Sequence, residues 1–504
     1  MLDPPPIEAQ QDAAYDRPEV AALGAKMRTG IAWKAASQLV SQASRMAMIV
    51  ILAHLLTPSD FGLAGLVLVF SGLIQLLTDV GFSASIVQLP TLTEEDRSTA
   101  FWTGLAVSSL FFVLAYVAAP YVADFYGKTS VRWMFVAVCS TLIIGALCTT
   151  QASILWRRME FRALEIRGMV AAVVASVVGI AAAAGGLGAW SLILQALALS
   201  IASTLTIWLL SPWKPRFIFS FASLRRMGLF SVNVFFARFA YYGDRNADNL
   251  LVGRFLGTSA LGLYSIGYSI ILIPAERLLW PIQSVLTPAM ARLQDDVPRM
   301  RALWLRGVRL TATLMFPSMV GVILVCPDFV TVVLGTKWAA ATAIIQILAW
   351  VGLIQSLTAL NGGVLQSLSR TGLLLRLSLF AFALDLGAFV LGLHWGVRGV
   401  AAAYAIANTA VIVPVSLVLV TRLLGEPLAR VAAELKGVLE ATTVMAVTVF
   451  LVRQGLVSAG LGAAPRLVLT VAAGAVVYLL MCFWRDRRVF TELRPRRLQE
   501  IASA

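Results

Sequence analysis

The stretch 63–70 (LAGLVLVF) decides the fold class, because its eight consecutive residues are all apolar and do not alternate with polar ones. The stretch 170–180 (VAAVVASVVGI) has almost the same character. A membrane-spanning β-strand would alternate polar and apolar residues over about 10 positions. Both stretches lie in longer apolar runs, and about 18 such residues suffice for a helix to cross a hydrocarbon core of about 30 Å. They therefore predict transmembrane helices.

Similar apolar runs recur along nearly the whole chain. Of the 504 residues, 59% are hydrophobic and 13% are charged, and the mean hydropathy is +0.84. Soluble domains carry about 25% charged residues, so the composition excludes a soluble protein. We predict an all-α integral membrane protein with fourteen transmembrane helices, at residues 31–56, 62–89, 99–120, 131–151, 168–184, 187–210, 228–252, 260–285, 307–326, 340–360, 371–392, 397–420, 433–453 and 463–484.

The positions of the basic residues predict the topology. The formal net charge of +14 is compatible with nucleic-acid binding, but 26 of the 40 Lys and Arg residues fall in alternate connections and in the two tails. Cytoplasmic loops of membrane proteins carry such an excess, so we place both termini in the cytoplasm and expect no nucleic-acid partner. The loops on the opposite side hold only Lys128, Arg132, Arg254, Lys337, Arg398, Arg453 and Arg466.

An internal repeat predicts the domain organisation. With the chain shifted by 200 residues, Arg45 coincides with Arg245, Leu56 with Leu256, and Gly62 with Gly262. Six spans separate the two copies, so the repeats run parallel and are related by a pseudo-twofold axis along the membrane normal. We predict a disordered cytoplasmic tail (1–25), a first six-helix lobe (26–227), a second six-helix lobe (228–422), two additional helices (423–484) and a basic cytoplasmic tail (485–504).

Polar residues on the first and seventh spans form the candidate substrate site. A charged side chain at the centre of a membrane helix costs about 2.5 to 3.5 kcal/mol on insertion scales, which makes such residues functional candidates. We expect a water-filled cationic cavity between the lobes that receives an anionic headgroup. Alternatively, Asp244 and Asp248 neutralise the arginines in a buried structural network. The candidate cavity residues are Lys34, Gln38, Gln42 and Arg45 on the first span, and Arg238, Tyr241 and Arg245 on the seventh.

Further carboxylates inside spans are candidates for ion coupling. Asp79, Asp244, Asp248, Glu276 and Asp385 form this set. Asp385 could bind a coupling proton or sodium ion, whereas Glu276 could instead pair with Arg277 at a helix end. The residues close to Asp385 in sequence or on neighbouring spans are Gln346, Gln355, Arg376, Tyr404 and Asn408. We predict no other cofactor and no metal site, because the four cysteines and two histidines have no metal-ligand spacing.

The connections between spans favour transport over catalysis. The extracytoplasmic connections are too short to fold as a domain, and no G-x-x-x-x-G-K-[ST] loop for a nucleotide is present. We therefore expect a transporter that is not an enzyme. One cytoplasmic connection, 214–227, carries Phe217, Phe219 and Phe221 between basic ends and is expected at the level of the lipid headgroups.

Several short motifs resemble the polysaccharide transporter family. They are Leu55–Gly62 (LLTPSDFG), Thr78–Phe82 (TDVGF), Gln151–Ser153 followed by Arg157–Phe161, Asp248–Gly253, and Leu261–Ser265. This family comprises the Wzx-type flippases of the multidrug/oligosaccharidyl-lipid/polysaccharide superfamily, and the chain resembles its colanic-acid or succinoglycan exporter branch over about residues 25–485.

The resemblance implies a fold like that of MATE transporters and the flipping of an undecaprenyl-pyrophosphate-linked oligosaccharide across the bacterial inner membrane. Exopolysaccharide, capsule or lipopolysaccharide synthesis would use the product. The implied partners are the lipid-linked oligosaccharide, membrane lipids, and possible polymerase and chain-length regulator proteins. A drug or metabolite cation antiporter and a lipid II flippase of the same superfamily are the near alternatives, and a membrane polysaccharide polymerase or ligase is the alternative from another class.

Overall fold

The computed structural model describes residues 40–78, 86, 92–226 and 246–485, and most of these residues are helical. No strand occurs among these residues. Ten of the described helical runs are long and apolar enough to cross a membrane, and the helices Val40–Leu55 and Pro58–Val69 are shorter apolar ones. The prediction of an all-α, multi-pass membrane protein is confirmed, whereas the count of fourteen spans stays a prediction.

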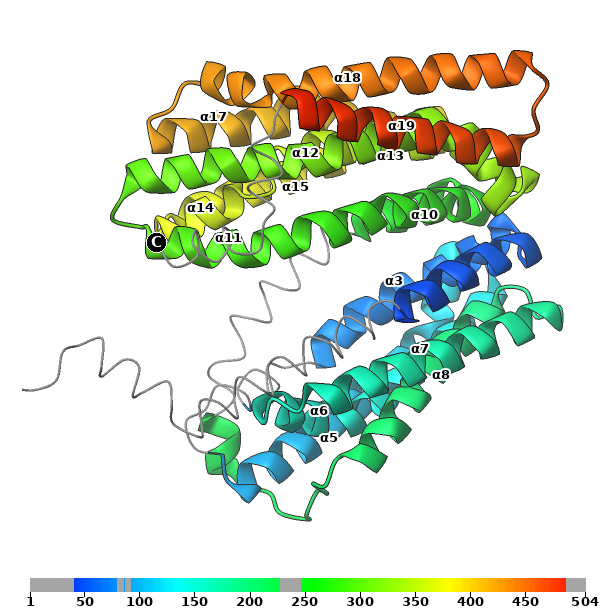
Figure 1. Cartoon of the computed structure of the whole chain (residues 1–504). Helices are drawn as coiled ribbons and strands as arrows, with labels where there is room; N and C mark the ends of the chain where they lie inside the picture. The colour runs from blue at the N-terminus through cyan, green and yellow to red at the C-terminus, as the bar shows by residue number, and fades with distance from the viewer. Residues whose placement is uncertain (1–39, 79–85, 87–91, 227–245, 486–504) are drawn as a thin grey trace, which may run out of the picture. The chain divides into compact units, whose positions relative to one another are not determined.

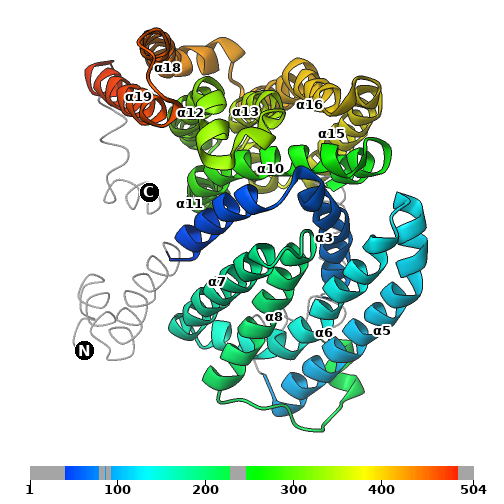
Figure 2. The same ribbon diagram turned by 90° about the vertical axis from the view of Figure 1, so that its right-hand side faces the viewer.

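The chain divides into two compact units, Met1–Asn246 and Ala247–Ala504. The first unit is a bundle in which α7 packs along α8, α5 along α6, and α6 contacts both α3 and α8. Figure 2 shows the α7–α8 and α5–α6 pairs. Its described helices are Val40–Leu55, α3 (Pro58–Thr78), α5 (Glu94–Tyr126), α6 (Thr129–Arg157), α7 (Phe161–Ala184) and α8 (Trp190–Leu210).

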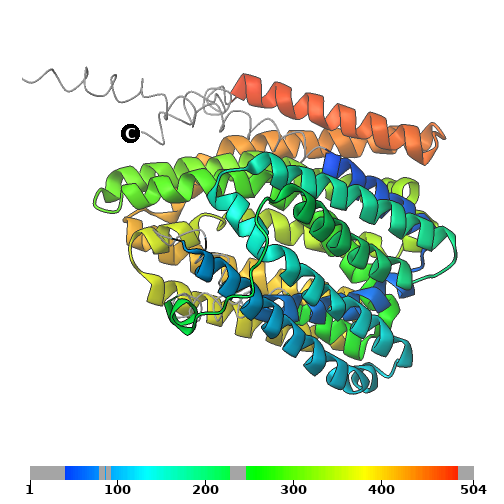
Figure 3. The same ribbon diagram turned by 90° about the horizontal axis from the view of Figure 1, so that it is seen from below.

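The second unit is a larger bundle in which α12 contacts α13, α18 and α19. Figures 1 and 3 show α18 (orange) and α19 (red) side by side. Three π-helical turns interrupt its helices, and such turns are frequent at functional sites. The elements are α10 (Gly257–Pro274), η1 (Ala275–Leu279), α11 (Trp280–Arg292), α12 (Val297–Phe329), η2 (Val330–Leu334), η3 (Thr336–Trp338), α13 (Ala341–Ser356), α14 (Asn361–Ser367), α15 (Thr371–Gly392), η4 (Leu393–Trp395), α16 (Gly396–Ala407), η5 (Asn408–Ile412), α17 (Val413–Leu424), α18 (Leu428–Ser458) and α19 (Ala463–Arg485).

Several helices extend beyond the apolar runs that predicted them. The expected connection around residues 286–306 is mostly helical, because α11 ends at Arg292 and α12 begins at Val297. The Asp296 carboxylate caps α12 by accepting a hydrogen bond from the backbone N–H of Arg299 at 3.0 Å. Capping groups and backbone hydrogen bonds decide where a helix ends, and hydropathy reports only the part that lies in hydrocarbon.

The motif Leu55–Gly62 forms a capped corner between two helices. The Asp60 carboxylate accepts hydrogen bonds from the Thr57 backbone N–H at 2.9 Å and from its hydroxyl at 2.7 Å. The Thr57 hydroxyl in turn accepts from the Asp60 backbone N–H at 3.3 Å. Gly188, with φ +53°, leaves room for the corner, since a Cβ there would lie 2.9 Å from the Asp60 carboxylate. The motif therefore has a structural role at the start of α3.

The two copies of the sequence repeat share a helix break at the same place. The helix that is described from Val40 onward ends at Leu55 and α3 starts at Pro58, while the helix through Val252 ends before α10 starts at Gly257. The backbone N–H of Leu56 donates to Leu52 at 2.8 Å, and that of Leu256 donates to Val252 at 2.9 Å. The second corner has no side-chain cap, because Ala260 stands where the first copy has Asp60.

Replacing the capping carboxylate tests the first corner. We expect Asp60→Ala to lower the free energy of unfolding by about 1 kcal/mol, the usual effect of losing a helix cap. Unfolding in mixtures of mild detergent and dodecyl sulfate measures this difference. The control is Ser259→Ala, at an exposed position of the uncapped corner. Equal stability of the two variants would contradict the assignment.

Candidate functional site

Most of the predicted cavity residues lie outside the described part of the chain. Of the first-span face, Gln42 and Arg45 are described, and the Arg45 side chain is exposed on the helix Val40–Leu55. Glu276 falls within η1. The residues outside the described ranges are Lys34, Gln38, Asp79, Arg238, Tyr241, Asp244 and Arg245. The cationic cavity and its structural alternative therefore both stay predictions.

The polar residues expected near Asp385 do come together in the second unit. Asn408, at the start of η5, donates from its side-chain amide to the Asp385 carboxylate at 3.0 Å. The Gln355 amide of α13 donates to the Asn408 carbonyl oxygen and to the Tyr404 hydroxyl, both at 2.9 Å. Four side chains from α13, α15, α16 and η5 thus form one network, which we call the Asp385 network.

Asp248 lies in a second buried group close by. Its carboxylate is only 4% exposed and accepts hydrogen bonds from the Tyr264 hydroxyl at 2.9 Å and from the Asn249 backbone N–H at 2.7 Å. Tyr264 lies on α10, and α10 packs against α16, which carries Tyr404. The Asp248 group and the Asp385 network therefore lie on helices that contact each other.

The chemistry of these two groups suits a small cation. Carboxylate, amide and hydroxyl oxygens are the ligands that hard cations prefer, and a carboxylate can also carry a proton. Two residues expected nearby lie elsewhere. Gln346 donates to the backbone carbonyl of Ile323 at 2.8 Å, and the Arg376 side chain is exposed.

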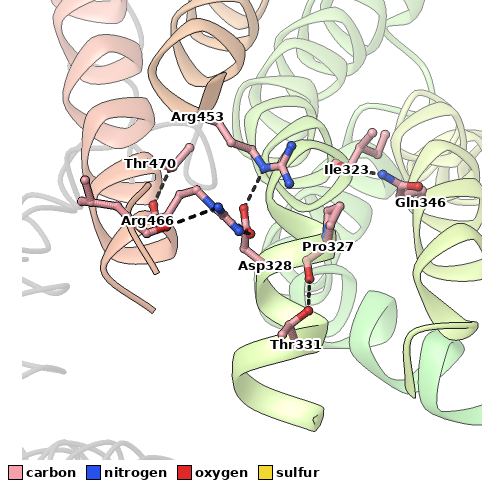
Figure 4. A network of polar contacts seen from close by, with 9 residues as sticks. Ile323, Pro327, Asp328, Thr331, Gln346, Arg453, Arg466 and Thr470 are labelled. Carbon is pink, nitrogen blue, oxygen red and sulfur yellow. Dashed lines mark hydrogen bonds and ion pairs between the residues drawn. The ribbon is translucent and has the colours of Figure 1, made fainter. Parts of the chain in front are cut away.

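A further charge cluster at one end of the second unit involves residues that sequence reasoning did not group. Asp328, 2% exposed, lies at the end of α12. Its carboxylate accepts hydrogen bonds from Arg453 Nε of α18 at 2.7 Å and from Arg466 Nε of α19 at 2.8 Å. Figure 4 shows both guanidinium groups converging on the carboxylate. We call this cluster the Asp328 clamp, because it joins three helices.

Ion pairs also join these helices near their other ends. Arg309 of α12 pairs with Glu434 of α18 at 3.3 Å, and Arg485 of α19 pairs with Glu440 of α18 at 2.9 Å. The helices α18 and α19 are thus bound to the second unit by charge at both ends as well as by apolar packing.

One signal in the sequence pointed to the Asp328 clamp. Arg453 and Arg466 are two of the seven basic residues on the side where the charge pattern disfavours them. A buried carboxylate partner explains both positions, since an opposite charge at hydrogen-bond distance stabilises each guanidinium. Their partner was not identified, because sequence alone does not tell which helix end lies beside α18 and α19.

The family of the chain follows from comparison with known proteins. A family profile described as "Polysaccharide biosynthesis protein" matches residues 51–343, which is more than half of the chain. This chain belongs to the polysaccharide biosynthesis protein family. The family predicted from the short motifs is therefore confirmed.

Individual relatives in this family match over most of their length. The teichuronic acid biosynthesis protein TuaB of Bacillus subtilis is 25% identical, with 73% of this chain and 75% of TuaB covered. The lipopolysaccharide biosynthesis protein WzxC of Escherichia coli is 23% identical, with 73% and 76% covered. The succinoglycan biosynthesis transport protein ExoT of Rhizobium meliloti is 24% identical, with 63% and 65% covered.

Solved structures share the fold of this family member. The lipid II flippase MurJ in an inward closed conformation superposes with a TM-score of 0.72 at 14% identity, covering 90% of this chain and 99% of MurJ. An inward-facing MATE multidrug transporter gives a TM-score of 0.60 at 16% identity, covering 79% and 96%. The expectation of a fold like that of MATE transporters is confirmed.

Removing the central charge tests the Asp328 clamp. We expect Asp328→Asn to lower the free energy of unfolding by about 2 to 4 kcal/mol, because two guanidinium groups lose their counter-charge inside the protein. This decrease is smaller than the one expected for a fully buried ion pair, because the Arg453 and Arg466 side chains are 23% and 18% exposed. Unfolding in mixed detergent micelles measures the change.

A matched variant separates charge from packing in the same experiment. Adding Arg453→Gln and Arg466→Gln to Asp328→Asn removes the uncompensated charges and is expected to recover part of the stability. If the triple variant is no more stable than the single one, the clamp does not act through its charges.

Proposed function

We propose that this protein flips an undecaprenyl-pyrophosphate-linked oligosaccharide from the cytoplasmic to the periplasmic leaflet of a bacterial inner membrane. The observation that carries the proposal is the family match over residues 51–343, together with a multi-helix fold shared with a flippase. The oligosaccharide would serve exopolysaccharide, capsule or lipopolysaccharide synthesis. A polymerase and a chain-length regulator would act on it after the flip.

Family membership also favours this function over its alternatives. The lipid II flippase and the multidrug transporter share only the fold with this chain, at 14% and 16% identity. The sequence relatives are named for teichuronic acid, lipopolysaccharide and succinoglycan. ExoT is named a transport protein, which supports transport over polymerisation or ligation.

The cationic cavity is the proposed binding site for the pyrophosphate. Arginine donates paired, charge-assisted hydrogen bonds to phosphate oxygens, and Arg45 and Arg245 occupy equivalent positions in the repeat. The lipid tail would remain in the bilayer while the sugars and pyrophosphate cross the membrane by alternating access. The charge distribution supports an orientation with both termini in the cytoplasm.

Single substitutions at the repeated arginines test the cavity. Arg45→Ala and Arg245→Ala are each expected to abolish polysaccharide export while the protein inserts at normal abundance, because each removes a phosphate donor. Exported polymer is measured in a strain that lacks the native gene, and membrane abundance is measured by immunoblot. Arg430→Ala is the control, since Arg430 is an exposed arginine on α18. Full export by the Arg45 and Arg245 double variant would exclude the cavity.

The Asp385 network is the proposed site of ion coupling. It joins the Asp385 carboxylate to the Asn408 side-chain amide, whose oxygen, like the Tyr404 hydroxyl, accepts a hydrogen bond from Gln355 inside the second unit. Binding of a proton or a sodium ion there would change the charge of a group inside the membrane. A change of this kind alters the relative free energies of two transporter conformations.

An isosteric substitution tests the coupling role. Asp385→Asn keeps an oxygen that can accept the Asn408 hydrogen bond but removes the charge. We expect it to eliminate the acceleration of substrate flipping by an imposed proton or sodium gradient in proteoliposomes, while substrate still binds. Asp295→Asn, which removes the charge of an exposed aspartate between α11 and α12, is the control. An undiminished response to both gradients in Asp385→Asn would rule out this site.

A further inference from the structure

The segment between α8 and residue 226 exposes three phenylalanines on one end of the first unit. The ring-bearing side chains of Phe217, Phe219 and Phe221 are 93%, 49% and 78% exposed. The backbone is irregular from Ser211 to Ser220, turns at Phe217, where the Ile218 N–H donates to the Arg216 carbonyl oxygen at 2.9 Å, and becomes helical at Phe221. The segment therefore exposes three apolar rings within five residues.

Contacts with the start of α5 hold this segment in place. The indole N–H of Trp102 donates to the Arg216 carbonyl oxygen at 2.7 Å, and the Trp102 ring stacks on Phe217 with centroids 4.9 Å apart. The backbone N–H groups of Arg216 and Ser220 donate to the hydroxyls of Ser98 at 3.2 Å and Thr99 at 3.0 Å. Figure 2 shows the chain after α8 passing beside the start of α5. The exposed rings thus belong to a segment that is held in place by hydrogen bonds and ring stacking with α5.

Tryptophan and ion-pair contacts brace the ends of the segment. Trp213 donates from its indole N–H to the Glu94 carboxylate at 2.8 Å, and Arg226 pairs with the fully buried Asp96 carboxylate. Because both ends are attached to the first turn of α5, the phenylalanines cannot turn inward without breaking these contacts.

Cationic side chains flank the phenylalanines. Lys214, Arg216 and Arg225 are exposed. Among the described residues the guanidinium groups of Arg216 and Arg225 have no ion-pair partner. Protein surfaces that enter the headgroup region of an anionic bilayer typically combine exposed aromatic rings with flanking cationic side chains. The cytoplasmic leaflet is the anionic one.

We propose that residues 214–225 form a preformed site for anionic phospholipid, in which the three phenylalanines enter the interface and Arg216 and Arg225 bind lipid phosphate. Through the bracing contacts, the site fixes the depth of the cytoplasmic ends of α5 and α8 in the bilayer. The choice of the cytoplasmic leaflet rests on the proposed orientation of the chain. No part of the proposal rests on the proposed transport function.

The depth of the segment is the first test. Ala222→Cys, at an exposed position beside Phe221, receives a nitroxide label while all three phenylalanines remain. The native cysteines are all buried, so the label reacts selectively with the folded protein. In nanodiscs that contain phosphatidylglycerol, we expect the nitroxide to collide with oxygen more often than with a water-soluble nickel chelate. Phe221→Ser is expected to reverse this ratio. A nitroxide that is fully accessible to the chelate would overturn the proposal and leave a cytosolic protein as the occupant of this surface.

The preference for anionic lipid is the second test. We expect Arg216→Gln with Arg225→Gln to weaken the retention of phosphatidylglycerol, measured by native mass spectrometry of the full-length protein, by about fivefold for each lost cation. Lys128→Gln is the control, because Lys128 is an exposed cation at the other end of α5. Equal retention by the double variant and the control would overturn the phosphate contacts.

A third experiment measures which side of the membrane the predicted cytoplasmic connections face. It distinguishes an error in the lipid-site proposal from an error in the proposed orientation. A membrane-impermeant maleimide applied to intact spheroplasts should not reach Asp295→Cys, an exposed position in another predicted cytoplasmic connection, whereas the same reagent should label it in inverted vesicles. Labelling in spheroplasts would contradict the orientation alone, since the depth and lipid measurements in nanodiscs do not depend on it.

Discussion

A charged or strongly polar group that is buried among helices needs a partner, and this constraint explains where the buried polar residues of the second unit lie. Asp328 has two arginine partners, Asp248 accepts the Tyr264 hydroxyl, and Asp385 accepts the Asn408 amide. Each of these bonds joins different helices, because one helix rarely supplies both partners. The hydrogen bonds and ion pairs of these polar groups therefore also determine which helices are neighbours.

The Asp328 clamp differs from the Asp248 and Asp385 groups in the charge of the donors that the structure describes. In the Asp328 clamp, full positive charges meet a carboxylate, so breaking it would leave charges uncompensated. The described donors to Asp248 and Asp385 are neutral amide, hydroxyl and backbone N–H groups. The clamp thus suits a permanent attachment of α18 and α19, while Asp385 is the carboxylate to which we assign the proposed ion coupling.

Hydropathy and charge predicted much of the fold, because membrane helices must be apolar over a fixed length and their loops follow a charge bias. The repeat aligned Leu56 with Leu256, and the structure has a helix break at both positions. Of the polar residues expected near Asp385, Gln355, Tyr404 and Asn408 join it in one network, whereas Gln346 and Arg376 do not. The Asp328 clamp and the Thr57–Asp60 cap were not predicted, because each depends on three-dimensional neighbours or on backbone geometry that hydropathy does not report.

The central claim is that this chain moves a lipid-linked sugar between leaflets, and reconstitution measures that movement most directly. Purified protein in liposomes would receive a fluorescent undecaprenyl-pyrophosphate oligosaccharide, and an impermeant reagent would destroy the fluorophore in the outer leaflet only. The account predicts that the protected fraction falls well below the value for protein-free liposomes, because inner-leaflet substrate moves outward and is destroyed. A protected fraction equal to that of protein-free liposomes, under either a proton or a sodium gradient, would contradict it.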